Sequence, residues 1–190
     1  MSEKYLLLII DSQKGIDDAE YWGGNRNNPD AEKNIVLILD LFRRSGLPVI
    51  HVQHCSNNSH SPLRPGQIGH AFKESNEPRE EELVVQKTET DAFINTNLTD
   101  TILALDVERI VITGFITNNS VEATARMSGN LGFNTIVISD ATATFNKTGL
   151  NGEVYDSELV HAMSLANLNE EYASIVSTQD LIEIMTKNIK

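Results

Sequence analysis

The chain of 190 residues contains a single cysteine, Cys55, and this scarcity excludes two classes of small protein. One cysteine cannot form an internal disulfide or a cysteine-rich zinc site. A low cysteine content is also typical of proteins in a reducing compartment, and it argues against redox chemistry as the function. We therefore expect a cytoplasmic protein that is stabilised by one hydrophobic core.

Long hydrophobic runs and basic residues are also scarce. The longest apolar run, residues 5–10, is far shorter than the roughly 20 residues that span a bilayer, and residues 1–4 lack the pattern of a signal peptide. The chain has 15 basic and 27 acidic residues, a net charge of −12. Because this charge repels phosphate backbones and anionic membranes, we expect neither nucleic acid nor membrane as a partner. An anionic small molecule stays open as a ligand, since a local lysine outweighs distant charges within a screening length of about 8 Å.

Short apolar runs alternate with segments of helical spacing. The runs are rich in β-branched residues and bounded by turns, which is typical of buried parallel strands; they span residues 5–10, 48–52, 83–85, 109–113, 134–139 and 173–176. One helical segment follows Asn28-Pro29-Asp30 and ends at Gly46. Four others span residues 98–105, 121–131, 158–168 and 179–187. This alternation predicts one α/β domain over residues 1–190: a three-layer, doubly wound, mostly parallel six-stranded sheet with helices on both faces, as in Rossmann-like folds.

Two stretches, residues 17–28 and 56–82, are polar and rich in turn residues. We do not expect them in the core. Connections of this length in a compact domain are usually functional lids or oligomer contacts. Trp22, in the first stretch, is a candidate apolar wall for a substrate or, with Tyr21, a contact in a homo-oligomer.

Three polar residues follow predicted strands, at the edge of an α/β sheet where ligands bind. Asp11 follows the first strand, Lys87 the third, and Ser120 begins the helix after the fourth. Each has a plain structural interpretation: Asp11 as a turn or cap, Lys87 as a solvated strand end, Ser120 as a helix N-cap. Together, a carboxylate, an ammonium and a hydroxyl on three strand ends can converge on one hydrolytic cleft.

The strand ends also carry longer motifs. They are Ile9-Ile10-Asp11-Ser12-Gln13, the run from Val85-Gln86-Lys87 to Asp91-Ala92-Phe93, the run from Gly114-Phe115-Ile116-Thr117 through Ser120-Val121 to Ala125-Arg126, and the run from Gly132-Phe133-Asn134 to Asp140-Ala141. In these motifs the chain resembles, over nearly its whole length, the isochorismatase-like hydrolases, which include nicotinamidases and N-carbamoylsarcosine amidohydrolases.

The resemblance implies a role for each motif residue. Asp11 would be the general acid or base, and Lys87 would orient it. The family's nucleophile is a cysteine, whereas this chain has Ser120 at that position. An oxyanion hole is implied at the backbone N–H groups of Ile116 and Ser120, next to a cis peptide between Phe115 and Ile116. The family is also usually homo-oligomeric. We place the substrate against Gln13, Trp22, His54, Phe93, Phe115 and Thr117.

The serine changes the expected chemistry, because a hydroxyl is far less acidic than a thiol and Asp11 is a poor base for it. Serine nucleophiles normally rely on histidine. His51 and His54 end the second strand; His51 fits a packed position within the strand, and His54 fits either a pocket or a surface role. Cys55 lies at the wrong strand end to replace the nucleophile, and we expect it to be structural.

No cofactor is expected. Metal-binding members of the family carry an Asp-x-His cluster after the second strand, but this chain has no carboxylate in the segment from His51 to Ser56. A lone loop histidine gives too few ligands for a metal ion. The Gly23-Gly24 segment lacks the lysine and the strand-to-helix context of a phosphate-binding loop.

Three functions remain open. The first is a small-molecule hydrolase, of amidohydrolase type, acting on an amide or related C–N bond through Asp11, Lys87 and Ser120. The second is hydrolysis of a vinyl ether, as in true isochorismatases, where acid catalysis by Asp11 needs no covalent nucleophile. The third is a ligand-binding or scaffold protein that keeps the pocket without turnover.

Overall fold

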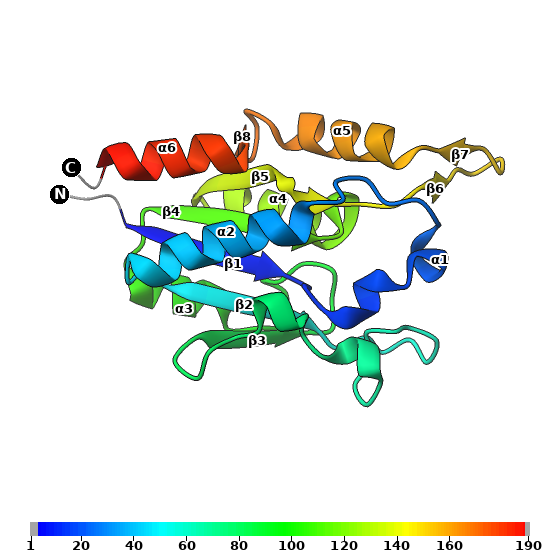
Figure 1. Ribbon diagram of the computed structural model, residues 1–190, viewed down its shortest axis with the longest axis horizontal. Helices are drawn as coiled ribbons and strands as arrows, with labels where there is room; N and C mark the ends of the chain where they lie inside the picture. The colour runs from blue at the N-terminus through cyan, green and yellow to red at the C-terminus, as the bar shows by residue number, and fades with distance from the viewer. Residues whose placement is uncertain (1–3, 189–190) are drawn as a thin grey trace.

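The computed structural model describes residues 4–188 and has a parallel sheet at its centre (Figure 1). The strands are β1 (Tyr5–Ile10), β2 (Val49–His54), β3 (Leu83–Lys87), β4 (Arg109–Phe115), β5 (Asn134–Ala143) and β8 (Ser174–Val176). They form one six-stranded sheet in the order β3-β2-β1-β4-β5-β8, with every pair parallel. The predicted doubly wound sheet is confirmed. β1, buried at all of its residues, lies between β2 and β4.

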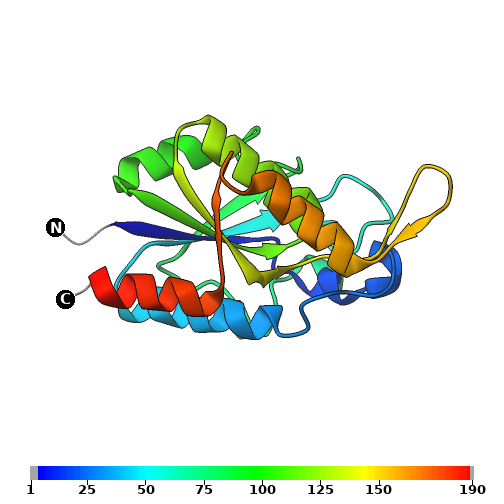
Figure 2. The same cartoon turned by 90° about the horizontal axis from the view of Figure 1, so that it is seen from above.

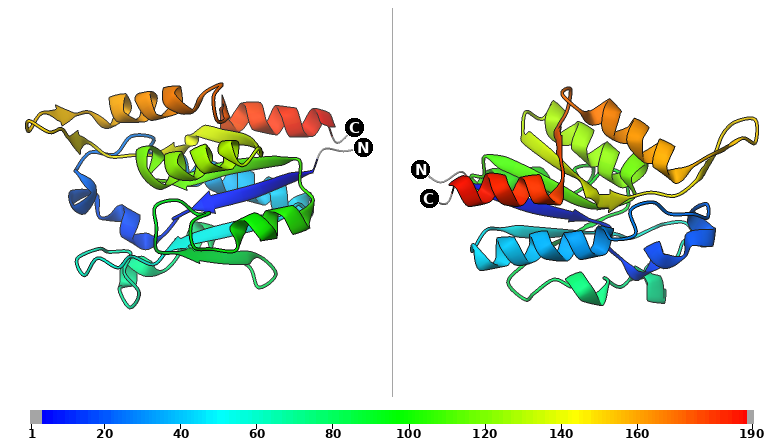
Figure 3. Two further views of the ribbon diagram at one scale, coloured as in Figure 1. Left: turned by 180° about the vertical axis from the view of Figure 1, so that it is seen from behind. Right: turned by 45° about the horizontal axis from the view of Figure 1, so that its top comes forward.

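Helices cover both faces of the sheet. α2 (Ala31–Arg44) and α6 (Thr178–Asn188) lie along one face (Figure 2). α3 (Leu98–Leu105), α4 (Glu122–Asn130) and α5 (Ser157–Leu168) lie on the other, as the view from behind shows (Figure 3). The smaller elements include a short helix, α1 (Ala19–Trp22), and 3₁₀ helices at Lys14–Asp17, Ile68–His70 and Glu74–Asn76. They also include a hairpin of β6 (Lys147–Thr148) and β7 (Val154–Tyr155), which extends away from the sheet (Figure 2). None of the helices within residues 4–188 has the length and apolarity needed to cross a membrane.

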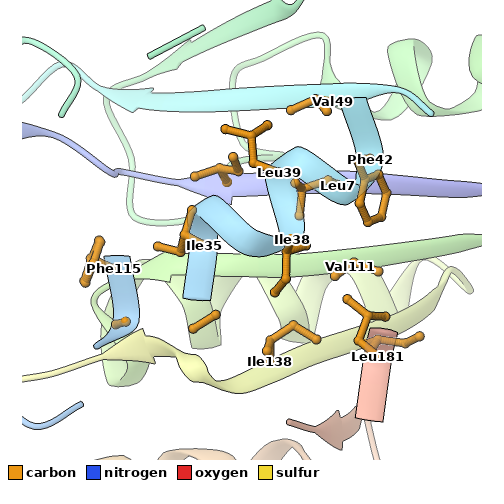
Figure 4. Packing of buried hydrophobic residues seen from close by; sticks show 14 of the residues in the cluster. Leu7, Ile35, Ile38, Leu39, Phe42, Val49, Val111, Phe115, Ile138 and Leu181 are labelled. Carbon is orange, nitrogen blue, oxygen red and sulfur yellow. The ribbon is translucent and has the colours of Figure 1, made fainter. Parts of the chain in front are cut away.

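The core has two parts because alternate side chains of each strand point to opposite faces. On one face Ile35, Ile38 and Phe42 of α2 pack against Leu7 and Val111 (Figure 4). On the other face, Leu8 and Ile112 contact the cluster formed with α3, α4 and α5. A sheet buried on both sides explains why its strands are continuous apolar runs in the sequence.

The segment boundaries differ from those predicted at several ends. β3 continues past the expected residue 85 so that Lys87 is its last residue, and β5 continues to Ala143. Both extensions contain polar residues. An apolar run in the sequence ends at such residues, whereas the backbone hydrogen bonds between the strands continue through them. β2 begins at Val49, because Pro48 has no N–H to donate to the ladder.

The two polar stretches contain short elements and buried residues. The first contains α1, and its Trp22 is half-buried. In the second, Leu63 is buried and belongs to the same core cluster as Ile16, so the expectation that this stretch lies outside the core was wrong. A single apolar residue among prolines and asparagines has no periodicity that would reveal its burial.

Gly114 allows β4 to approach β1 closely. Its φ is +114°, and a Cβ added there would lie 2.0 Å from the carbonyl oxygen of Ile10. Only glycine fits such a position. The register of the β4–β5 pair shifts between Ile112 and Gly114, and just beyond it the chain turns toward Ser120.

Candidate active site

Three strand ends bring Asp11, Lys87 and Ser120 together at the carboxyl edge of the sheet. Asp11 follows β1, Lys87 is the last residue of β3, and Ser120 lies in a π-helical turn, Thr117–Val121, between β4 and α4. All three are buried, with exposed fractions of 2%, 2% and 7%. They lie 76 and 33 residues apart in the sequence, and the parallel order of the strands is what makes them neighbours.

The Lys87 ammonium connects the other two groups. Its Nζ donates to Asp11 Oδ2 at 2.9 Å and to Ser120 Oγ at 3.2 Å. The carbonyl oxygens of Thr90 and Glu89 accept from the same nitrogen at 3.0 and 3.1 Å. Four acceptors around one ammonium offset much of its lost hydration. The interpretation of Lys87 as a solvated strand end was therefore wrong.

The plain interpretation of Ser120 as a helix N-cap also fails, because α4 has no side-chain N-cap bond. Asp11 does lie at a turn, with a φ of +48° and a carbonyl oxygen that accepts from the Gln13 N–H at 2.8 Å. Its side chain has a further role, since Oδ2 accepts from Lys87. Among the described residues, 4–188, no partner hydrogen-bonds to the other buried oxygen of Asp11, Oδ1. A buried carboxylate oxygen normally has a partner, so this atom is the natural contact for a bound molecule.

A cavity of about 140 Å³ opens over Asp11 and Ser120, and Lys87 lies behind them, outside the residues that line it. Trp22, Phe115 and Leu63 form apolar walls, and Asp11, Ser120, His54 and Thr90 are among its polar lining residues. The sequence did not single out Leu63, Thr90 or Asn119, nor Ser56, Asn58 and Ser61 from the long second polar stretch. The length of that stretch was the only signal that it serves the site.

His54 lines the cavity but is not placed as a base for Ser120. Its Nδ1 lies 3.4 Å from Lys87 Nζ, and within residues 4–188 the structure records no hydrogen bond between His54 and Ser120. Burial lowers the pKa of His54; the Asp11 carboxylate opposes this shift and the Lys87 ammonium adds to it. The imidazole is therefore neutral at pH 7, with Nδ1 oriented toward a cation.

Three of the side chains expected at the substrate do not line this cavity. Gln13 is buried, and its Nε2 donates to the carbonyl oxygens of His54 and His70 at 3.1 and 2.9 Å. Phe93 stacks on Phe133 in the core. The Thr117 hydroxyl lies 2.9 Å from His161 Nδ1. Each belongs to a matching motif, but motif membership does not tell a substrate contact from a residue that supports the loop.

The other side chains expected at the substrate, those of Trp22, His54 and Phe115, line the cavity. Phe115 and Ile116 line it, and the peptide bond between them is cis. The oxyanion hole at Ile116 and Ser120 stays a prediction. Cys55 is not among the lining residues; its Sγ lies 3.3 Å from His70 Nε2, and burial raises the pKa of its thiol. His51 is buried, as its place within the strand predicted, with Nε2 2.9 Å from Glu82 Oε2.

A family model described as "Isochorismatase domain" matches residues 5–180 of the chain. The chain belongs to the isochorismatase family of hydrolases. It is 44% identical over 187 residues to the isochorismatase family protein YrdC of Bacillus subtilis, covering 98% of this chain and 99% of that protein. The recognition of the family from the four motifs is thereby confirmed.

Solved structures of isochorismatase family proteins have the same fold. One from Chromobacterium violaceum is 44% identical with a TM-score of 0.93, and covers 98% of this chain and 95% of its own. More distant relatives include Nicotinamidase 3 of Arabidopsis thaliana, 27% identical over 78% of this chain and 76% of that protein. Streptothricin hydrolase of Streptomyces noursei is 31% identical over 74% of this chain and 54% of that protein.

Proposed function

We propose that the protein hydrolyses an amide or related C–N bond of a small molecule, with Asp11 as the proton carrier and Ser120 as the attacking group. The contact of one ammonium, Lys87 Nζ, with both Asp11 Oδ2 and Ser120 Oγ is the observation that carries this proposal. Relatives named nicotinamidase and streptothricin hydrolase support it at the level of reaction class.

The proposed chemistry assigns one task to each group. Ser120 Oγ attacks the substrate carbonyl carbon, and its proton passes to Asp11, whose Oδ1 is unpartnered. Asp11 then delivers that proton to the leaving nitrogen as the C–N bond breaks, which leaves an ester on Ser120. Water, deprotonated by Asp11, attacks the ester carbonyl carbon, and the bond to Ser120 Oγ breaks as Asp11 returns the proton to Oγ and the acid is released. The Lys87 ammonium, 3.2 Å from Oγ, stabilises the negative charge that develops on the hydroxyl as it attacks.

A second candidate is acid-catalysed hydrolysis of a vinyl ether. It is favoured by the absence, within residues 4–188, of a histidine hydrogen-bonded to Ser120, and by the unpartnered Asp11 Oδ1 at the cavity. Protonation of the vinyl carbon by Asp11 and attack of water on the resulting cation would need Ser120 only for positioning. The two candidates share Asp11 and differ in what Ser120 does.

Substitutions at Ser120 distinguish them. We would assay wild type, Ser120→Ala, Ser120→Cys and Asp11→Asn on a panel of small amides and on isochorismate, and follow adducts by intact mass. For the covalent amide reaction, Ser120→Ala abolishes turnover, while Ser120→Cys retains or raises it because a thiol is more acidic. Asp11→Asn costs a factor of about 10² to 10⁴ in either reaction.

The opposite results are equally informative. If Ser120→Ala retains amide hydrolysis, the covalent step is wrong, and if only isochorismate is turned over, the second candidate replaces the first. Full activity of Asp11→Asn would exclude both. Circular dichroism and thermal unfolding of each variant ensure that a loss of rate is not a loss of fold.

A further inference from the structure

The cavity above Asp11 does not end at Trp22. Trp22, Ile116 and Asn119 also line a second space of about 170 Å³, which we call the outer cavity. Its other lining residues come from the turn that carries Ser120 and from the segment after β5: Asn118, Thr144, Phe145, Asn146 and Lys147. Since the two spaces share three walls, one elongated molecule can occupy both.

Two side-chain amides of the outer cavity, those of Asn118 and Asn146, present hydrogen-bond donors. Asn118 Oδ1 accepts from the Thr144 hydroxyl at 2.5 Å, and Asn146 Oδ1 accepts from the Ser157 N–H at 2.9 Å. Both carbonyl oxygens are thus used within the protein. The structure records no acceptor for either side-chain NH₂ group within residues 4–188. These donors are left for a bound acceptor.

Lys147 adds a positive charge at the same place. It is exposed at the start of β6, lines the outer cavity, and takes part in no ion pair recorded within residues 4–188. No carboxylate is among the lining residues of the outer cavity, although Lys147 and Asn118 also line an adjoining space to which Glu122 contributes. An ammonium and two amide donors fit a carboxylate.

Trp22 forms the apolar wall between the two spaces. Its Nε1 donates to the Gly15 carbonyl oxygen at 2.8 Å, and its ring stacks on Phe145 with centroids 6.4 Å apart. These contacts fix the indole, whose face suits an apolar spacer.

We propose that the outer cavity binds a carboxylate at the far end of the substrate, so that the protein acts on amides with a remote acid group. The amide lies over Ser120, the spacer lies along Trp22, and the carboxylate accepts from Lys147, Asn118 and Asn146. This inference rests on the proposed function for the position of the amide, and it adds the class of substrate.

Trp22 is the only tryptophan of the chain and lines both spaces, so its fluorescence reports binding without turnover. We would titrate Ser120→Ala protein with monoamides of dicarboxylic acids of increasing chain length and with matched neutral amides of monocarboxylic acids. The same titrations would be made with two double variants, in which Lys147→Gln or Lys147→Arg is combined with Ser120→Ala. Lys187→Gln is the control for charge, because it makes the same change near the end of α6, away from the hairpin (Figure 1).

We expect the acidic amides to bind more tightly than the neutral ones. Lys147→Gln should weaken their binding about 10- to 100-fold, the effect of losing a hydrogen bond between charged groups. Lys147→Arg should recover part of it. Neutral amides should bind equally to all variants, which also shows that Lys147→Gln is folded, and Lys187→Gln should change nothing.

The inference is overturned if Lys147→Gln leaves acid binding unchanged, if it weakens neutral and acidic ligands equally, or if the acidic amides do not bind. These outcomes are independent of the proposed reaction. Lys147-dependent binding without hydrolysis by wild-type protein would contradict the reaction alone, whereas hydrolysis without dependence on Lys147 would contradict the carboxylate site alone.

Discussion

Lys87 and Asp11 form an ion pair whose side chains are almost completely withdrawn from water, with exposed fractions of 0% and 3%. A buried pair of this kind contributes little net stability compared with an apolar pair of the same size, but removing one partner leaves a buried charge without compensation. The pair therefore ties the stability of the fold to the groups that line the cavity.

We expect Lys87→Met to lower the free energy of unfolding by about 3 to 5 kcal/mol, because the Asp11 carboxylate then lacks its cation. The double variant Asp11→Asn, Lys87→Met should recover most of this loss. Urea unfolding followed by circular dichroism measures both. A loss in Lys87→Met below about 1 kcal/mol, or a double variant no more stable than the single one, would contradict the role of the pair.

At the residue level, sequence reasoning identified Asp11, Lys87 and Ser120 because each follows a strand that the apolar pattern reveals. It did not separate Gln13, Phe93 and Thr117, which support the loops, from residues that line the cavity. That distinction depends on where a side chain finds its partners, and Gln13 finds them in the backbone of residues 54 and 70. No local pattern records such long-range contacts.

Between elements, a buried polar cluster connects α2 to the segment before β3. Arg43, in the last turn of α2, contacts Glu82 through Nε and Nη2 at 2.7 and 2.8 Å, and His51 of β2 contacts the same carboxylate. Burial alone would raise the pKa of Glu82, but hydrogen bonds from Arg43, the Arg79 backbone and His51 outweigh it and lower the pKa to about 2. Burial lowers the pKa of His51, which keeps it neutral.

A depressed carboxyl pKa stabilises the fold above the ordinary value of 4.5, and this contribution is lost as the pH falls toward about 2. We expect the free energy of unfolding of wild type to decrease across that window, and Glu82→Gln to show a shallower decrease from a lower starting value. Urea unfolding at a series of pH values measures the slope. Glu171→Gln, at an exposed position, is the matched control, and an equal slope in wild type and Glu82→Gln would contradict the assignment.

The elements themselves were largely predictable. Residues 5–10 and 98–105 match β1 and α3 at both ends, since apolar spacing is regular there. The short hairpin β6–β7 was not predicted, because each of its strands has only two residues and carries no alternation. The helix after β4 was predicted to begin at Val121, with Ser120 opening it, whereas the structure has both residues in a π-helical turn that precedes α4.

For the whole molecule, self-association stays a prediction. The structure suggests other contact residues than Tyr21 and Trp22, which the sequence indicated. Trp22 faces the cavities rather than solvent alone, while Leu150 and Val154 of the hairpin segment and Leu159 and Met163 of α5 are more than half exposed. Leu159 and Met163 line one space together with Tyr155 of β7, and exposed apolar side chains that lie together are typical of protein contacts. We propose that a second copy of the chain covers these side chains.

Light scattering should therefore give a mass that is a multiple of 21.1 kDa at micromolar concentration. Leu150→Asp with Met163→Glu should shift it toward the single chain, because charges in an apolar contact are costly to bury. Leu103→Asp, exposed on α3, is the control and should leave the mass unchanged. A wild-type mass of one chain would contradict the prediction.

The strand order also determines when the site can exist during synthesis. β1 pairs with β2, about 44 residues later, and with β4, which begins 104 residues after β1. A nascent chain that ends before β4 contains Asp11 and Lys87 but lacks Ser120, and one edge of its most apolar strand is unpaired. Such an edge is a template for pairing with another chain. Until the ribosome has released β4, the site is thus incomplete and this edge of β1 has no partner strand. The arrangement that unites the three residues therefore also leaves the first half of the chain open to pairing with other chains.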